Sequence, residues 1–510
     1  MIPFGQCPVA RRPWFLLLPL SLTLGPKAAA QIIPIRSVPL AQGDQFLIFP
    51  SANLGMGGVS IALADSLFDP FRNPAMGARV AAGRLFAAPA VYGISRETGG
   101  GRTLPLGLLG RAGPWFGGLS GAIQQVEYSG PMPSVGFPIG ITRVQSTSIL
   151  PNPVGLSDRS HGNSYLQASL GRVLTGSGLS VGGGVSWSRL RAVSGEDLLY
   201  PGSQGLTQSG HQLDLRLGMV KEWPGNRSLE ALILHDRYSM TDDVGYLDLF
   251  WDAGTQQFVQ VPRVEHELNR LTTTGLHAAY QMPLASAGWR IGWIATANFD
   301  RQPRIAPDEI VTLSRDEGRS SAYNLGVGFS KAEGQSTFGI DAIYEPIWST
   351  TWAVASAPIV TALGNAIPEG GRTAENRFRF SNVVLRLGVS QDLPLSDMKK
   401  GVGLQLGLAV RSMHYRLVER DYLAGTSQPF RDSWVEWSPT WGLSLRFPQL
   451  ELHYRGRIMN GTGRPSNFNV VFSDPLAATP TNILLPPGGT LGLAGVSTVT
   501  HQISLSLPLR

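Results

Sequence analysis

The sequence contains a single cysteine, Cys7, among 510 residues. Cys7 lies in an N-terminal stretch that has the form of an export leader, so we expect the mature chain to contain no cysteine. A chain without cysteine has no disulfide framework, no thiolate metal site and no cysteine nucleophile. This absence argues against disulfide-rich secreted domains, zinc modules built on cysteine, and thiol enzymes.

Charged residues are also scarce, at 15% of the chain, whereas ordinary soluble domains contain about 25%. That is too little charge to cover the surface of a soluble protein of this size. Beyond the N-terminus, no apolar run approaches the roughly 18 residues that a spanning helix needs, and the mean hydropathy is +0.01. We therefore do not expect a helical membrane protein either.

Residues 1–30 have the three parts of a secretory signal peptide. Arg11 and Arg12 form a short basic region, Trp14–Leu24 an apolar core, and three alanines ending at Ala30 a cleavage site. The core is too short to span a membrane, although a retained N-terminal anchor is the alternative. We expect the mature chain to begin near Gln31, outside the cytoplasm.

Removal of residues 1–30 lowers the number of Lys and Arg residues from 42 to 39, against 36 Asp and Glu residues, so the net charge falls from +6 to +3. The sequence also has no lysine- or arginine-rich run. A nearly neutral chain without basic clusters does not predict a nucleic-acid partner.

From about residue 84 onward, apolar and polar residues alternate. In residues 211–219, Leu213, Leu215 and Leu217 share one face, while Asp214 and Arg216 share the other. The same pattern recurs in residues 382–389, 401–410, 441–447 and 502–509. Strict alternation predicts β-strands with one apolar and one polar face.

The lengths and spacings of these segments predict a closed barrel. Many segments run for about ten to fourteen residues, which suits a tilted strand that crosses a bilayer. Short links at 175–178, 224–227, 332–335 and 448–449 alternate with long loops near 127–162, 194–210, 240–265, 301–320, 347–376, 417–432 and 460–497. Short turns on one side and long loops on the other are typical of an outer-membrane barrel. Seven long loops predict about 14 strands, or 16 if residues 84–110 form a further hairpin.

Tryptophan placement agrees with this interpretation, because interfacial girdles of such barrels are rich in aromatic residues. The tryptophans near expected strand ends are Trp115, Trp187, Trp223, Trp289, Trp293, Trp348, Trp352, Trp434 and Trp441. A large secreted β-sandwich or propeller is the alternative for the alternating pattern. Its exposed faces would need more charge than these segments carry.

If the strands begin only after residue 80, residues 31–80 have no place in the barrel wall. We expect this segment to lie inside the lumen as a plug, and the barrel to occupy residues 81–510. Glycine permits close backbone packing, and Asn-Pro favours a turn. Asp65, Asp69 and Arg72 would then pair with polar side chains of the wall.

Within this segment, "LGMGGVSIALAD" and "FRNPAMG" resemble the N-terminal hatch of the FadL/TodX-type outer-membrane transporters of hydrophobic compounds. They are equally similar to the PorV-type barrels associated with type IX secretion. The motif match covers roughly residues 52–78. The residues carried over as hatch positions are Gly55, Gly57, Gly58, Ala64, Asp65, Asn73, Pro74 and Ala75.

The resemblance implies a monomeric barrel in the outer membrane of a Gram-negative-type bacterium. Its partners would be outer-membrane lipid and hydrophobic small molecules such as long-chain fatty acids, admitted by passive, hatch-gated diffusion. A PorV-like barrel that binds secreted partner proteins, or a general porin, is the alternative. The chain departs from such barrels at its end, which reads "LPLR" instead of finishing on an aromatic residue.

The expected long loops carry apolar residues, and exposed apolar patches usually mark a binding surface. In residues 350–368 the candidate substrate-binding residues are Trp352, Val354, Ile359, Val360 and Leu363. Residues 134–141 and 482–489 add further apolar side chains. The alternative is that these loops cap one another.

The sequence contains no convincing catalytic or metal-binding pattern, so we expect neither an enzyme nor a cofactor. Residues 178–182, "GLSVG", match G-x-S-x-G, but a strand rather than a helix is expected to follow Ser180. His266 lacks the second histidine of a zinc-binding helix. Charges expected inside the barrel are interpreted as a paired network that also holds the plug.

Overall fold

The computed structural model describes residues 44–95, 99–127, 160–196, 205–252, 254–285, 288–306, 315–361, 363–394, 401–465 and 493–509. The expected leader, residues 1–30, and the start of the expected plug, residues 31–43, lie outside the described residues. The apolar stretches 134–141 and 482–489 also lie outside them.

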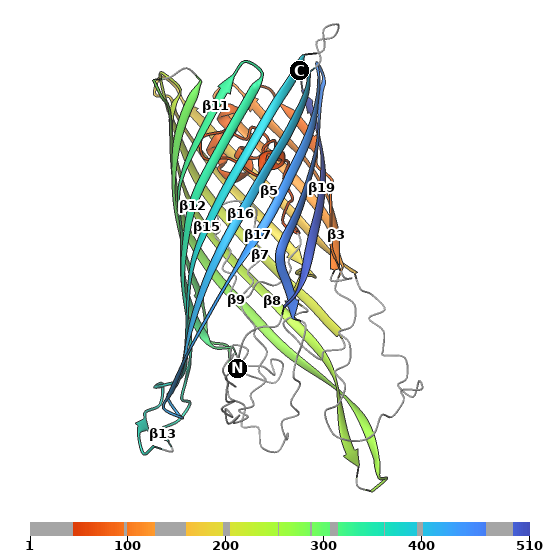
Figure 1. The fold of residues 1–510 in the computed structure, drawn as a ribbon, viewed down its shortest axis with the longest axis vertical. Coiled ribbons are helices and arrows are strands. Elements are labelled where there is room, and N and C mark those ends of the chain that lie inside the picture. The colour runs from red at the N-terminus through yellow and green to blue at the C-terminus, as the bar shows by residue number, and fades with distance from the viewer. Residues whose placement is uncertain are drawn as a thin grey trace, which may run out of the picture.

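The chain forms a large antiparallel sheet that closes on itself (Figure 1). Its strands are β1 (Arg84–Ala87), β2 (Ala90–Ile94), β3 (Gly99–Ala112), β4 (Trp115–Glu127), β5 (Ser160–Leu174), β6 (Leu179–Leu190), β7 (Gly205–Trp223), β8 (Arg227–Asp252), β9 (Gln257–Pro283), β10 (Trp289–Gln302), β11 (Glu317–Glu333), β12 (Ser336–Val354), β15 (Arg372–Pro394), β16 (Gly401–Asp421), β17 (Thr426–Phe447), β18 (Leu450–Pro465) and β19 (Leu493–Pro508). From β2 to β19, each of these wall strands pairs with the next one along the chain, which is the simplest barrel topology.

The barrel closes where β19 pairs with both β1 and β2, each of which also pairs with β3. β1 and β2 therefore share one position in the wall, interrupted at Ala88 and Pro89. The described sheet then has 16 strand positions. This confirms the all-β barrel and the additional hairpin over residues 84–110.

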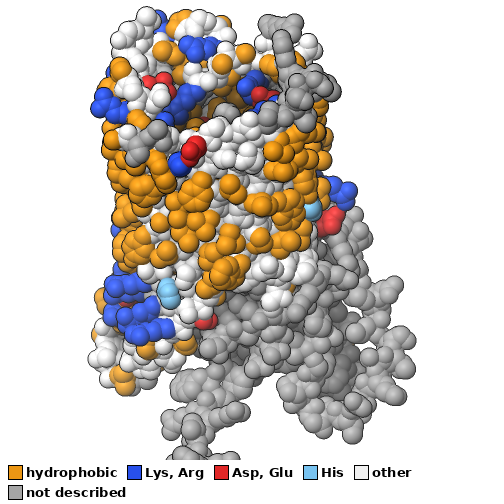
Figure 2. All heavy atoms as spheres, turned by 45° about the horizontal axis from the view of Figure 1, so that its top comes forward, with side chains coloured by type: hydrophobic (Ala, Val, Ile, Leu, Met, Phe, Trp, Pro, Cys, Tyr) orange, Lys and Arg blue, Asp and Glu red, His pale blue; other side chains and the backbone are white. Residues whose placement is uncertain are grey.

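The two faces of the strands follow the alternation of the sequence. On β7, Leu215 and Leu217 are exposed on the outer face, whereas Asp214 and Arg216 are buried on the inner face. Figure 2 shows the resulting apolar belt across the visible outer face of the barrel. Closure joins the first strands of the wall to the last, so the sheet does not end in an open edge, which hydrocarbon would penalise. A closed barrel with an apolar belt outside and a polar interior is the architecture of a protein of the outer membrane.

The short links were predicted well, but three expected loops are shorter than we predicted. The turns at 175–178, 224–226, 334–335 and 448–449 separate consecutive strands. By contrast, β8 and β9 remain paired as far as Asp252 and Gln257, and β16 and β17 as far as Asp421 and Thr426. Residues 347–354 and 372–376 also belong to strands. The alternation pattern did not predict these extensions, because strands that leave the bilayer carry polar residues on both faces.

In the part of the chain that the structure describes, helical structure is confined to three short turns before β1. These are η1 (Leu54–Met56), α1 (Asp69–Arg72) and η2 (Pro74–Arg79). Among the described residues, no helix is long and apolar enough to cross a membrane.

Candidate functional site in the barrel lumen

Residues 44–83, which we call the lumenal segment, lie inside the barrel (Figure 1). The η1 turn contacts β15, β16, β17 and β18, while η2 contacts β3, β4, β5, β6 and β7. Ser60 and Ile61 reach β12 through the carboxylate of Asp341. A segment of forty residues can touch strands on opposite sides of a barrel only from within it.

Glycines on the inner face of the wall make room for this segment. A Cβ atom on Gly407 would lie 2.1 Å from the backbone nitrogen of Gly57, and one on Gly388 would lie 2.3 Å from the carbonyl oxygen of Met56. On the opposite side, a Cβ atom on Gly218 would lie 1.8 Å from Oδ1 of Asn73. The segment and the wall therefore touch at backbone distance.

The three glycines predicted as hatch positions lie against β15, β16 and β17. Gly57 and Gly58 have φ angles of 70° and 75°, a region that favours glycine. The backbone nitrogen of Gly57 donates to Oγ1 of Thr440 at 2.8 Å, and that hydroxyl donates to the carbonyl oxygen of Gly55 at 3.0 Å. The glycines let the chain turn sharply and still hydrogen-bond to the wall.

Asp65 organises the segment from inside rather than binding the wall. Its carboxylate accepts hydrogen bonds from the hydroxyl of Ser51 at 2.6 Å and from the backbone nitrogens of Ala52 and Asn53 at 2.8 and 3.1 Å. Asp65 is 2% exposed. The neighbouring Ala64 is exposed, and its carbonyl accepts from Asn53. One carboxylate thus joins two stretches of the segment.

Asn73, Pro74 and Ala75 fasten the other end of the segment to the wall. The amide nitrogen of Asn73 donates to Oε1 of Glu230 at 3.1 Å, while its oxygen accepts from the backbone nitrogen of Ala75 and caps η2. Pro74 faces Gly182 and Gly184 of β6, where a Cβ atom would lie 2.9 Å away. The Asn-Pro-Ala motif therefore serves as a side-chain anchor and a close-packed turn.

Charged wall residues bind the segment as well as one another. Arg216 forms a bidentate pair with Asp214, at 2.9 and 2.8 Å, and also donates to the carbonyl oxygens of Phe71 and Arg72. Asp341 accepts from the backbone nitrogen of Ser60 at 2.8 Å. Such buried charges need both an opposite charge and hydrogen bonds. Here backbone groups of the segment supply some of the hydrogen bonds.

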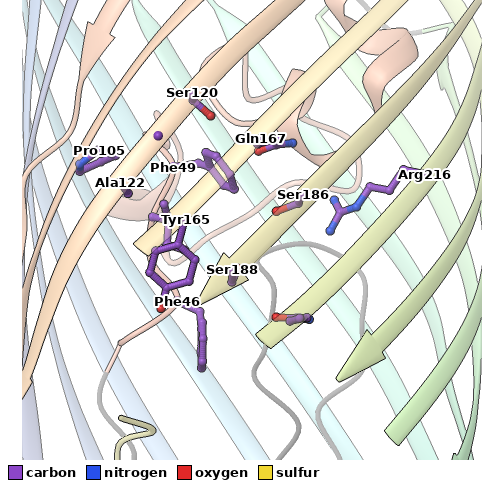
Figure 3. Close-up of a pocket in the computed structure, with 13 residues that line it drawn as sticks. Phe46, Phe49, Pro105, Ser120, Ala122, Tyr165, Gln167, Ser186, Ser188 and Arg216 are labelled. Carbon is purple, nitrogen blue, oxygen red and sulfur yellow. The ribbon is translucent and has the colours of Figure 1, made fainter. Parts of the chain in front are cut away.

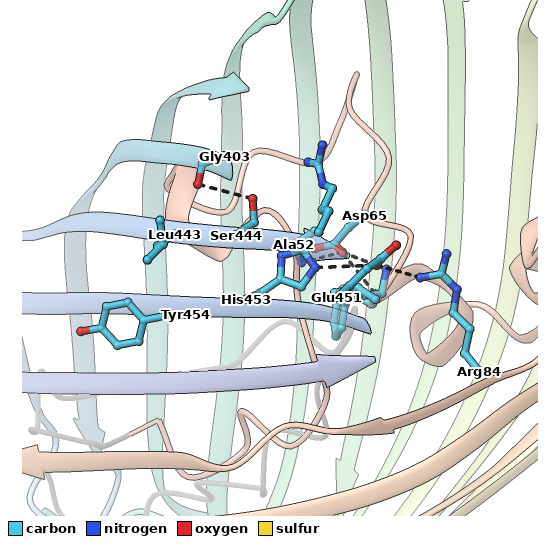
Figure 4. A network of polar contacts seen from close by, with 12 residues as sticks. Ala52, Asp65, Arg84, Gly403, Leu443, Ser444, Glu451, His453 and Tyr454 are labelled. Carbon is cyan, nitrogen blue, oxygen red and sulfur yellow. Dashed lines mark hydrogen bonds and ion pairs between the residues drawn. The ribbon is translucent and has the colours of Figure 1, made fainter. Parts of the chain in front are cut away.

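A second polar network joins the segment to β18 near the short-turn end (Figure 4). Nε and Nη2 of Arg455 donate to the carbonyl oxygen of Ala52 at 3.3 and 3.2 Å, and Nη2 lies 2.8 Å from Nδ1 of His453. Glu451 in turn accepts from Arg84 at 3.1 Å. This network fixes the segment where it approaches its own exit into β1.

One side of the lumen is apolar and aromatic. Phe49 and Phe71 of the segment stack with ring centroids 4.3 Å apart, and Phe71 meets Phe86 of β1 edge to face at 5.1 Å. They belong to a buried cluster whose other members are Ile48, Val80, Leu109, Ala122, Tyr165, Leu190, Val193, Tyr238 and Met240. The lumen therefore offers an apolar track as well as charged anchors.

A small pocket opens beside this cluster (Figure 3). Its lining includes Phe46, Phe49 and Tyr165, together with polar residues such as Gln167 and Arg216. The cavity volume is about 20 Å³, which is room for about one water molecule. An acyl chain cannot enter it unless the lumenal segment moves.

The loop residues predicted to bind substrate lie at the long-loop end. Val360 and Leu363 are 73% and 64% exposed. Ile359 and Val360 form β13 (Ile359–Val360), which pairs with β14 (Ala366–Ile367). Trp352 and Val354 instead belong to the end of β12. The guanidinium groups of Arg319 and Arg372 lie 5.7 and 4.8 Å from the centre of the Trp352 ring. The five residues are thus divided between a strand and a small hairpin.

At the same end, the inner face of the wall carries an apolar cluster that we did not predict. Its buried members are Ala322, Ile347, Phe378, Phe380 and Leu417, with Tyr415 and Phe430 packed against them. They come from the adjacent strands β11, β12, β15, β16 and β17. The alternation could have predicted this cluster, because these apolar residues occupy strand positions whose neighbours on the same face are mostly polar.

The described residues contain no cluster of His, Cys, Asp or Glu side chains that could hold a metal ion. Ser180 of the G-x-S-x-G string lies in β6, is 5% exposed and contacts the carbonyl oxygens of Ala75 and Val220. Its context is a hairpin and a strand, not the strand, turn and helix of a nucleophile elbow.

No family model and no curated protein matches the chain. Similar solved structures include a FadL homologue from Pseudomonas aeruginosa, at 12% identity over 91% of this chain and 99% of that one, with a TM-score of 0.44. The CymD monoaromatic hydrocarbon channel has 10% identity over 92% and 98%, with a TM-score of 0.34. A bacterial polysaccharide outer membrane secretin has 7% identity over 84% and 99%, with a TM-score of 0.39. Likenesses this distant carry no argument about function, which we base on the geometry.

Proposed function

We propose that this protein is an outer-membrane transporter that admits hydrophobic compounds, such as long-chain fatty acids, by passive diffusion gated by the lumenal segment. In this proposal the lumenal segment is the hatch, and Gly55, Gly57, Gly58, Ala64, Asp65, Asn73, Pro74 and Ala75 are its key positions. The observation that carries the proposal is the backbone-distance contact between this segment and the glycines of the wall.

Two further features support a hydrophobic rather than a general substrate. The inner wall at the long-loop end bears the cluster around Phe378 and Phe380, and the lumen contains the aromatic track from Phe49 to Phe86. Apolar compounds gain free energy at both places because burial removes their surface from water, by about 25 cal/mol per Å². A general porin needs an open aqueous bore instead.

The proposal predicts that locking the segment to the wall stops transport. A Cβ atom on Gly339 would lie 3.4 Å from the Cβ of Val59, close to the roughly 3.5–4.5 Å found in disulfides. The double variant Val59→Cys, Gly339→Cys should therefore form a disulfide between hatch and wall. Because the only native cysteine is Cys7, the expected mature chain offers no competing thiol.

A matched control joins only the last residue of the same segment to the chain end that follows β19. A Cβ atom on Gly83 would lie 3.4 Å from the Cβ of Leu509, so Gly83→Cys, Leu509→Cys should form a disulfide that leaves residues 44–80 free. Uptake of radiolabelled oleate is measured in Gram-negative cells that lack their own channel for it. We expect the first variant to lose uptake until dithiothreitol is added, and the second to retain it.

Three outcomes would contradict the proposal. Undiminished oleate uptake with a complete Val59→Cys, Gly339→Cys cross-link would mean that the segment is no gate. Uptake of small hydrophilic solutes at the same rate as oleate would identify a general porin. Failure of the wild-type chain to admit oleate, with a secreted protein bound to its loops, would favour the PorV-like alternative.

A further inference from the structure

Three arginines lie side by side on adjacent strands near the long-loop end of the barrel. Arg379 of β15 is the cross-strand partner of Arg416 of β16, and Arg416 is the partner of Arg431 of β17. On the other side, Arg379 pairs with Trp348 of β12. We call Arg379, Arg416 and Arg431 the arginine row.

The arginine row faces outward, in line with the apolar belt. On β15, Val383 is exposed, and Arg379 lies four residues earlier in the chain, on the same face. On β17, Val435 and Arg431 stand in the same relation. All three arginines are exposed. Figure 2 shows Lys and Arg side chains gathered just beyond the belt at the lower left, the side to which these strands run in Figure 1.

The row lies at the outer edge of a headgroup layer. Four residues of strand span about 13 Å, which a tilt near 40° reduces to about 10 Å along the membrane normal. The polar layer on each side of the hydrocarbon is about 5–8 Å thick. Trp348, which is 44% exposed, occupies the same row as an interfacial aromatic residue would. The long-loop end is the extracellular end of such a barrel, so the row meets the outer leaflet.

The protein itself does not neutralise these charges. None of the three arginines forms an ion pair with any of the described residues. Glu375, four residues from Arg379 on β15, is buried and already bound by Arg372 and Arg377. Glu419 and Asp432 fall on alternate positions of β16 and β17, whose side chains point to the other face. Like charges directly opposite one another destabilise a sheet, so an external anion would relieve this repulsion.

We propose that the arginine row binds the phosphate groups of a glycolipid in the outer leaflet. Guanidinium groups bind phosphate oxygens in a bidentate manner and are weakly hydrated. Three of them, spaced by the strand separation of about 4.8 Å, match a headgroup with more than one phosphate. The proposal needs the outer-membrane barrel but does not depend on the transported compound.

The test measures binding of fluorescent lipopolysaccharide to the detergent-solubilised full chain by anisotropy. Competitors are the same lipopolysaccharide after enzymatic dephosphorylation, phosphatidylglycerol, and an acidic polypeptide such as polyglutamate. The variants are Arg379→Gln, Arg416→Gln, Arg431→Gln combined, and the same three positions changed to Lys. Arg172→Gln is the matched control, because Arg172 is an exposed outward arginine on β5 at the opposite rim, beside Trp115.

We expect the triple Gln variant to bind about a hundredfold more weakly, since each basic residue near an anionic surface contributes about fivefold. The triple Lys variant should retain part of the affinity, and Arg172→Gln should bind as the wild type does. All variants should keep the heat-dependent gel migration of a folded barrel, because the changed side chains are exposed.

Unchanged binding by the triple Gln variant would overturn the proposal. Equal competition by dephosphorylated lipopolysaccharide would show that phosphate is not recognised. Equal competition by phosphatidylglycerol would show that the row has no preference for the glycolipid. Stronger competition by polyglutamate would indicate that the row binds an acidic protein rather than a glycolipid.

Discussion

The side-chain amide of Asn73 donates a hydrogen bond to Oε1 of Glu230 at 3.1 Å, across 157 positions of sequence. Asn73 is completely buried and Glu230 is 8% exposed. The contact joins the last turn of the lumenal segment to the beginning of β8. Because both groups are buried, removal of either side chain would leave the other without this hydrogen bond.

Asn73→Ala should therefore loosen the lumenal segment without unfolding the barrel. The change removes the bonds to Glu230 and to the backbone nitrogen of Ala75, at a cost of about 1–3 kcal/mol. Hydrogen–deuterium exchange over residues 69–79 should become faster. Ser66→Ala is the control, since Ser66 is exposed. Equal exchange in both variants would contradict an anchoring role for Asn73.

Gly407→Ala should displace η1 from the wall. The new Cβ atom would lie 2.1 Å from the backbone nitrogen of Gly57, and backbone cannot rotate away as a flexible side chain can. Ion conductance across planar bilayers should rise, because the displaced segment no longer fills the lumen. Gly495→Ala on β19 meets no atom within 4 Å and should conduct as the wild type does. Wild-type conductance of Gly407→Ala would show that the segment adapts without moving.

The lumenal segment should be held more firmly at acidic pH. Burial, and then the nearby carboxylate of Asp65, raise the pKa of Asp69 from its ordinary value of 3.8 to about 7, with Glu230 adding to the shift and Arg72 opposing it. Asp69 belongs to the lumenal segment, not to a spanning strand. Because the folded pKa is raised, the stabilising contribution is complete below pH 3.8 and is lost as the pH rises through 7.

Exchange over residues 65–73, corrected for the intrinsic rate, should therefore increase from pH 5 to pH 8. Asp69→Asn remains neutral throughout and can still accept the hydrogen bond from the backbone nitrogen of Asp65. Its exchange should not depend on pH in this range. A pH dependence that persists in Asp69→Asn would assign the effect to another group.

Val360→Ser with Leu363→Ser should weaken capture of hydrophobic compounds. Both side chains are largely exposed, so the change should leave thermal stability within about 0.5 kcal/mol. Partial burial of two such side chains against a ligand corresponds to about a tenfold change in affinity. Binding of a fluorescent fatty acid to the solubilised chain measures this effect, with Ala357→Ser as the control. An unchanged dissociation constant would mean that the β13–β14 hairpin is not part of the binding surface.

Local patterns in the sequence were enough to predict the strands and their two faces. Leu215 lies outside and Asp214 inside because alternate side chains of a strand point to opposite faces, whatever the strand pairs with. The same holds for the barrel as a class, since few charges and an apolar face on every strand leave membrane hydrocarbon as the partner. The motif around Asn73 and Pro74 also followed from local turn chemistry.

The tertiary structure alone decided which residues meet. Val59 packs against Gly339, and Gly57 against Gly407. The register of each successive strand pair around the closed wall places those glycines at the height of the segment. The full extent of β8 and β9, and the division of the 84–110 hairpin into β1, β2 and β3, likewise depend on pairing with neighbouring strands. Alternation specifies a face within one strand, whereas contacts between distant residues depend on closure of the whole barrel.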